Sequence, residues 1–214
     1  MRPTMIALCL SAALTSGCST LSRPHVVEVV APQPVETDTG WRAIARPEDQ
    51  QRIDAIDARF EAALADLPRR LQPRDAADKQ LLDPKAARPL PALTPGGYQC
   101  RRLRLGGHAK LTRFKADTCY IKLEGEDRLS YTTLSGPLMP GGWLYPDGNN
   151  RLILLATDRP ASAKAAPAYG TGAGQDLAGV VERLGPMRWR LTIPRAGEFD
   201  IWELKPWPTQ KLED

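Results

Sequence analysis

The sequence predicts a mainly β fold: a small antiparallel β-barrel, or alternatively a β-sandwich, with an N-terminal amphipathic helix packed on it. After residue 97 the chain is a series of short segments rich in aromatic and β-branched residues, most of them separated by glycine, proline or asparagine. Two of the separators, "PDGNN" and "PRAGE", are hairpin-turn signals. Before residue 97 the apolar residues instead follow a helical period.

The helical part begins at Pro47, because proline suits the first helical turn and the following Glu48 and Asp49 suit the positive end of the helix dipole. Apolar residues then recur at three- and four-residue steps, namely Ile53, Ile56, Phe60, Ala63 and Leu67. This spacing predicts one amphipathic helix that ends before Pro68. A short second helix is expected over Asp75–Leu82, and the proline-rich stretch 83–97 predicts an extended connector.

The β part runs from "YQCRRLRLG" at residue 98 to "EFDIWELKP" at residue 198 and contains seven or eight candidate strands. That number of strands, at this spacing, is typical of an antiparallel barrel or a sandwich. Of the two, we expect closure into a small barrel, with the helix over an end or a side of it.

The first residues have the layout of a secretory signal: one early positive charge at Arg2, an apolar run, and then small residues. The apolar run, 5–14, is too short to span a bilayer as a helix. It ends in "LTSGC", which resembles the lipobox of bacterial lipoproteins. This resemblance implies cleavage before Cys18 and attachment of diacylglycerol to its sulfur. Ser19 after the cysteine implies sorting to the outer membrane of a Gram-negative cell, facing the periplasm.

The predicted organisation follows from this signal. Residues 1–17 are a lipoprotein signal peptide, 18–39 the lipidated cysteine and a flexible tether, 40–207 a single globular domain (helical over 47–82, β over 97–205), and 208–214 a tail. Cleavage would leave 197 of the 214 residues and, without Arg2, lower the net charge from +4 to +3. A weakly basic chain of this kind implies no nucleic-acid partner. We also expect no cofactor.

Several short motifs distributed along the domain resemble the DUF4893 family, a family of uncharacterised bacterial proteins. The motifs are Trp41-Arg42, "GYQCR" followed by Leu105-Gly106, "LYPD" before "RLILLA", Tyr169-Gly170, "GVVERLG", "RWRLTIP" and "IWELKP". The resemblance covers roughly residues 40–207. It implies no activity and assigns no catalytic residue.

Two cysteines of the mature domain, Cys100 and Cys119, are expected to form a disulfide, because an oxidising compartment favours pairing. Adjacent antiparallel strands would bring them within bonding distance. Alternation places Cys119 on an apolar face and Cys100 on a face with arginines, so a bulge, or a position of Cys100 before the strand, is needed to reconcile them. The alternative, zinc held by Cys100, His108 and Cys119, lacks a fourth ligand.

Six basic residues lie within fifteen positions without one acid; they are Arg101, Arg102, Arg104, Lys110, Arg113 and Lys115. They predict either a solvated strand face or a contact with an anionic envelope component. The loop "YGTGAGQD" contains three alternating glycines, and its Tyr169 and Asp176 are candidates for ligand contact at a barrel mouth.

The function expected from these patterns is a non-catalytic module that binds a ligand or a protein in the periplasm and contacts the membrane through Cys18. The first alternative is an envelope glycan hydrolase that uses a carboxylate pair such as Asp117 with Glu124 or Asp176. A second alternative is a structural or inhibitor-like protein with a filled barrel. Nucleophilic catalysis is not indicated, since Ser135 lacks a Gly-x-Ser-x-Gly motif and His108 is the only histidine of the domain.

Overall fold

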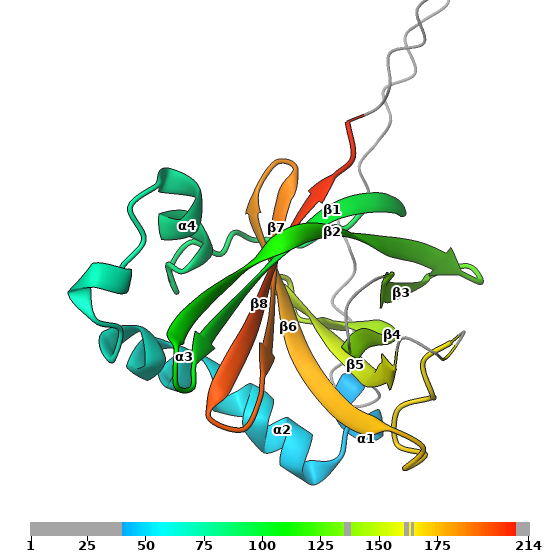
Figure 1. Ribbon diagram of the computed structural model, residues 1–214. Helices are drawn as coiled ribbons and strands as arrows, with labels where there is room; N and C mark the ends of the chain where they lie inside the picture. Colours follow the sequence, from blue (N-terminus) through cyan, green and yellow to red (C-terminus); the bar gives the residue numbers. More distant parts are fainter. Residues whose placement is uncertain (1–39, 135–137, 161–162, 164, 209–214) are drawn as a thin grey trace, which may run out of the picture. The chain divides into compact units, whose positions relative to one another are not determined.

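The structure, a computed structural model, describes residues 40–134, 138–160, 163 and 165–208. Within these residues, eight antiparallel strands form a closed barrel in which each strand pairs with its neighbours in sequence and β8 pairs with β1 (Figure 1). The strands are β1 (Gly96–Gly106), β2 (Lys110–Glu124), β3 (Arg128–Thr133), β4 (Leu138–Asp147), β5 (Arg151–Pro160), β6 (Gln175–Gly185), β7 (Arg188–Pro194) and β8 (Glu198–Pro206). The predicted barrel is therefore confirmed.

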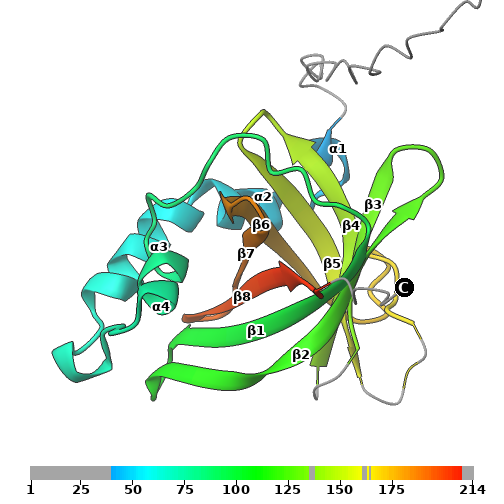
Figure 2. The same ribbon diagram turned by 90° about the horizontal axis from the view of Figure 1, so that it is seen from above.

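Short helices cover one side of the barrel (Figure 2). They are α1 (Trp41–Ile44), α2 (Pro47–Asp54), α3 (Ile56–Ala65), the 3-10 turn η1 (Arg69–Leu71) and α4 (Ala76–Leu81). The single helix expected from Pro47 onward is divided at Ala55, whose backbone leaves the helical region. Ile53 and Ile56, on either side of the division, are both buried, at 0% and 3% exposure, as the predicted apolar face requires. Helix α4 begins as predicted, with the Asp75 carboxylate accepting a hydrogen bond from the Asp78 N–H.

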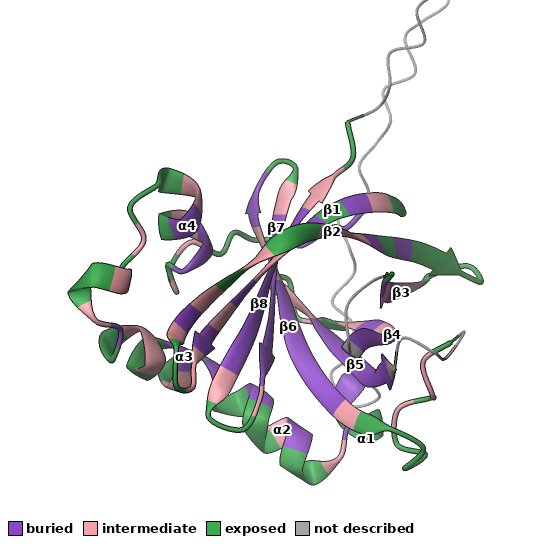
Figure 3. Ribbon diagram, viewed as in Figure 1, coloured by how far each residue is buried: buried purple, intermediate pink, exposed green. Residues whose placement is uncertain are grey.

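Two hydrophobic cores follow from the alternation of side chains along the strands. One lies inside the barrel and includes Tyr98, Trp189 and Trp202. The other lies between the barrel wall and the helices, where Phe60 of α3 meets Phe199 of β8 with ring centroids 5.6 Å apart. Strands β6, β7 and β8 are consequently buried on both faces (Figure 3).

The predicted disulfide between Cys100 and Cys119 is confirmed, with Cα atoms 6.0 Å apart. Both cysteines are fully buried and belong to the core inside the barrel. The register also resolves the face of Cys100: it lies inside the barrel, on the same side of β1 as Arg102 and Arg104, whereas Leu103 faces the helices. A bulge does occur, but it lies between Arg101 and Leu103, after the cysteine.

The expected signal peptide 1–17, the tether 18–39 with Cys18, Ser135 and the tail from residue 209 onward lie outside the described residues. In the described part of the chain, no helix is long and apolar enough to cross a membrane.

Candidate functional site

A row of six charged residues of alternating sign crosses the outer face of the barrel. Each residue lies opposite the next in the strand register, over β4, β5, β6, β7, β8 and β1. In this order the charged row is Asp147, Arg151, Glu182, Arg190, Glu203 and Arg101. Cross-strand pairs of opposite charge stabilise a sheet. Three pairs within the row are salt bridges, at 2.6 Å (Asp147–Arg151), 2.7 Å (Glu182–Arg190) and 3.0 Å (Glu203–Arg101).

The charged row also attaches the helices to the barrel. Arg190, 2% exposed, donates to the main-chain carbonyls of Leu81 and Asp83 at 3.0 and 2.7 Å. Arg101 donates to the Asp78 carboxylate on α4 at 2.6 Å. The Arg190 guanidinium thus satisfies carbonyls that the end of α4 leaves without helical partners, and Arg101 binds a side chain of the same helix. Most of the row therefore has a structural role.

The predicted basic strand is divided between the two faces of the barrel wall. Arg102 and Arg104 lie inside, where Asp200 of β8, at 0% exposure, accepts hydrogen bonds from Arg104 at 2.9 and 3.1 Å. The Arg102 guanidinium lies over the ring of Phe114, 3.9 Å from the ring centroid, and 3.9 Å from the nearest Asp200 oxygen. Burial lowers the pKa of Arg102, and the neighbouring Arg104 lowers it further, while Asp200 opposes both.

Of the other four basic residues, Arg101 and Arg113 lie on the outer face. Lys110 lies at the β1–β2 turn, and the register shift puts Lys115, together with Phe114, opposite Arg102. Arg101 and Arg113 share the buried carboxylate of Asp78, to which Arg113 donates at 2.8 Å. Lys110 lies 2.5 Å from the Asp66 carboxylate, and both of these side chains are exposed. Lys115 is exposed as well, and among the described residues no carboxylate lies within 4 Å of its ammonium group. The six residues thus do not form one continuous basic patch.

The glycine-rich loop attaches a helix to the barrel. The Tyr169 hydroxyl donates to Asp49 of α2 at 2.6 Å and accepts from the Arg46 N–H at 2.9 Å. Burial and the hydrogen bond to Asp49 raise the pKa of Tyr169. Asp176 binds the Arg46 guanidinium at 2.9 Å and the Gly170 N–H at 3.0 Å. Tyr169 and Asp176 do come together, but at the start of α2.

The alternative sites gain no geometric support among the described residues. His108 lies in the β1–β2 turn, and both candidate partner cysteines are in the disulfide. No group of three or more His, Cys, Asp or Glu side chains in the described part is arranged to hold a metal ion. Asp117 and Glu124 are seven residues apart on β2, about 23 Å at ~3.3 Å per residue, whereas glycosidase carboxylates lie ~5–9.5 Å apart.

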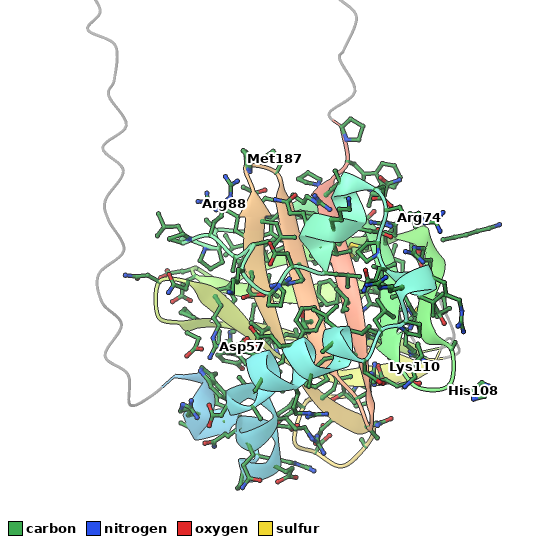
Figure 4. All side chains as sticks on the ribbon, turned by 90° about the vertical axis from the view of Figure 1, so that its left-hand side faces the viewer. Asp57, Arg74, Arg88, His108, Lys110 and Met187 are labelled. Atoms are coloured by element: carbon green, nitrogen blue, oxygen red, sulfur yellow. A yellow bond between two sulfur atoms is a disulfide. The ribbon has the colours of Figure 1, made fainter. Side chains whose placement is uncertain are left out.

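A solvent-open cleft of about 680 Å³ lies over the first three members of the charged row. It is bounded by α3, by the connector between α4 and β1, and by the β4–β5 turn; its lining residues are Asp57, Ala87, Arg88, Pro89, Asp147, Gly148, Asn150, Arg151 and Glu182. Its volume falls in the range of ligand sites, ~300–1,000 Å³. In Figure 4, Asp57 and Arg88 project on the side of this cleft, and His108 lies far from them.

The charges deep in the cleft already have partners, whereas those at its rim are open to solvent. The Asp147 carboxylate accepts from Trp41 Nε1 at 2.9 Å and from Arg151 at 2.6 Å. Asp57 is 80% exposed, and its nearest cation, Arg151, is 3.8 Å away. Among the described residues, no carboxylate lies within ion-pair distance of the exposed Arg88 guanidinium. The cleft therefore presents one anion and one cation to a ligand.

The connector holds Arg88 at the rim through main-chain hydrogen bonds. The Arg88 N–H donates to the Arg183 carbonyl of β6 at 2.8 Å, and the Leu90 N–H donates to the Asn149 carbonyl at 2.7 Å. Leu90 has φ 58°, a left-handed conformation that costs about 1–2 kcal/mol for a residue of this kind. Sequence reasoning missed this cleft, because its residues come from four separate segments. The signals in the sequence were the motifs "LYPD", "RLILLA" and "GVVERLG", which contain Asp147, Arg151 and Glu182.

Comparison with known proteins gives one match. The family described as "Domain of unknown function (DUF4893)" matches residues 41–204. No curated protein and no solved structure matches the chain.

Proposed function

The chain belongs to the DUF4893 family, and we propose that it is a lipid-anchored protein of the Gram-negative envelope that acts as a non-catalytic interaction module. In this proposal Cys18 carries the lipid, the domain faces the periplasm from the outer membrane, and a partner protein contacts the cleft beside the β4–β5 turn. The partner segment carries both an acidic and a basic group, to match Arg88 and Asp57.

The proposal rests on which charged groups of the cleft already have partners within the protein and which are exposed to solvent. The Asp147 carboxylate binds Trp41 and Arg151. The Glu182 carboxylate binds Arg190, so both carboxylates are held by structural contacts. A general acid or nucleophile instead needs a group that reaches the substrate. The exposed rim charges are suited to selecting a partner and fixing its orientation. This arrangement favours binding over catalysis.

A photo-crosslinking amino acid in place of Asn150, which lines the cleft, tests the interaction in living cells. We expect a discrete cross-linked product that is lost when Arg88→Glu reverses the rim charge. The matched control is Lys85→Glu, which reverses an exposed charge of the same connector outside the cleft and should leave the product unchanged. No product, or equal products in the two variants, would show that the cleft is not the contact surface.

The membrane anchor is tested separately by the intact mass of the membrane-extracted protein. The expected mass lacks residues 1–17 and includes acyl chains on Cys18. Several chains are needed for stable attachment, because a single chain binds a bilayer only marginally. A Cys18→Ser variant should lose the acyl mass and the stable attachment. An unmodified cysteine in the native protein would refute the anchor without affecting the cleft.

A further inference from the structure

Strand β2 has a free edge along its first half. It pairs with β1 from Lys110 to Ile121 but with β3 only from Cys119 to Glu124. The Leu134 N–H closes the pairing at the Thr118 carbonyl, at 3.1 Å. Among the described residues, the segment 110–116 therefore has a neighbouring strand on one side only (Figure 2).

A free edge presents main-chain N–H and C=O groups from alternate residues, and an extended peptide can add to it as a further strand. Edges are commonly guarded against unselective pairing by a bulge and by basic side chains. This edge has both, since β2 has one extra residue opposite Arg102, between Arg113 and Ala116, and Arg113 and Lys115 are exposed. Such an edge disfavours pairing with most strands but can still pair with a strand of complementary charge.

Positive groups flank the edge on both sides of the barrel wall. On the outer side, Arg113 must share the Asp78 carboxylate with Arg101. Lys115 lies in the bulge of β2 opposite Arg102, is exposed, and has no described carboxylate within 4 Å of its ammonium group. On the inner side, Phe114 carries the Arg102 guanidinium over its ring.

Two buried polar groups lie in the same interior. The Tyr131 hydroxyl and the Trp202 Nε1 have no hydrogen-bond partner among the described residues. Arg102 lies opposite Trp202 in the register, 5.3 Å from its ring centroid. Both of these atoms are buried, so the positive group beside the edge on this side of the wall is the Arg102 guanidinium.

We propose that this edge of β2, residues 110–116, accepts an extended, acid-rich segment of a partner protein as an added strand. Main-chain hydrogen bonds supply the attachment, and acidic side chains supply the selectivity for Lys115 and Arg113. A second copy of the chain fits poorly, because it would bring the same basic residues against each other. This surface shares no residue with the cleft, so the two proposals fail or succeed independently.

The test uses the full chain and a ten-residue fluorescent peptide that alternates valine with glutamate. We expect binding that weakens at least ~tenfold in Lys115→Glu, because a like charge then faces the peptide. Lys85→Glu, which reverses an exposed charge away from the edge, should leave the affinity unchanged. A peptide with lysine in place of glutamate should not bind.

A third peptide separates strand addition from charge attraction alone. It keeps the glutamates but is N-methylated at alternate main-chain nitrogens, which removes the donors that a strand needs. Equal binding of this peptide, or no binding of the acid-rich peptide, would overturn the proposal. Sedimentation gives a further check, because a concentration-dependent dimer that excludes the peptide would assign the edge to a second copy. Binding that appears only after deletion of residues 26–30, "VVEVV", would assign it to the chain's own segment.

Discussion

Replacement of Asp200 by asparagine is the sharpest test of the charged interior. Asp200 is 0% exposed and accepts hydrogen bonds from Arg104 at 2.9 and 3.1 Å and from Arg195 at 3.1 Å. Asparagine keeps the volume of the side chain but removes its negative charge. Arg195 retains its contact with Asp158, whereas Arg104 keeps only Glu198, at 3.4 Å. The substitution therefore leaves partly buried positive charge without its main partner.

Removing one partner of a buried ion pair typically costs about 3–5 kcal/mol. The lower end applies here, because the Arg104 side chain is 35% exposed and water can solvate part of its charge. We therefore expect Asp200→Asn to lower the free energy of unfolding by about 3 kcal/mol. For a domain of this size, ~2–4 °C per kcal/mol corresponds to a fall in Tm of about 6–12 °C.

The assay is urea unfolding at pH 7, followed by tryptophan fluorescence, with the disulfide kept oxidised. The matched control is Asp66→Asn, which removes the carboxylate of an exposed pair with Lys110. Such pairs contribute about 0–1 kcal/mol. If Asp200→Asn lowers the free energy of unfolding no more than Asp66→Asn does, the view that buried charge pairs stabilise this end of the barrel is refuted.

Two further predictions concern the disulfide and one buried carboxylate. The double variant Cys100→Ala/Cys119→Ala should lose about 3 kcal/mol in the same unfolding assay, since the bond closes a loop with a sequence separation of 19; a variant as stable as the native protein would contradict this. Burial raises the pKa of Glu203, but Lys205, Arg188 and Arg101 outweigh burial and lower the pKa below its usual 4.5. The contribution of Glu203 to stability is thus present above pH 4.5 and is lost as the pH falls through the lower pKa of the folded state. The difference in free energy of unfolding between the native protein and Glu203→Gln should therefore shrink below pH 4.5. A difference that stays constant with pH would count against this pairing.

The sequence was sufficient to predict the strands of the barrel, the two hairpin turns and the disulfide, because each depends on local patterns or on a short separation along the chain. Closure of the barrel instead depends on the pairing of β1 with β8, which lie far apart in the sequence. The sequence was also not sufficient to place the arginines of β1. Alternation puts Arg102 and Arg104 on one face and Leu103 on the other, and the usual rule assigns the apolar face to the barrel interior. Here the helices cover Leu103, and Asp200, 96 residues from Arg104, allows the charged face to be inside.

The same limit applies to Tyr169 and Asp176. Their glycine-rich segment is typical of a surface loop, and the sequence therefore suggested a ligand at a barrel mouth. The tyrosine instead contacts Asp49, which precedes it by 120 residues, and Asp176 contacts Arg46. No local pattern reports a partner at such a distance, so a docking contact and a ligand contact look alike in the sequence.

The charged row gives the family motifs a physical meaning. All six of its members belong to short motifs through which the sequence resembles DUF4893, and in the structure they meet as one ladder that holds α4 and the connector on the barrel. Changes in these residues should therefore act first on stability. Arg88 and Lys115 lie outside the row and are exposed without a described carboxylate partner. Charge reversal at these two positions can therefore separate a loss of partner binding from a loss of folding.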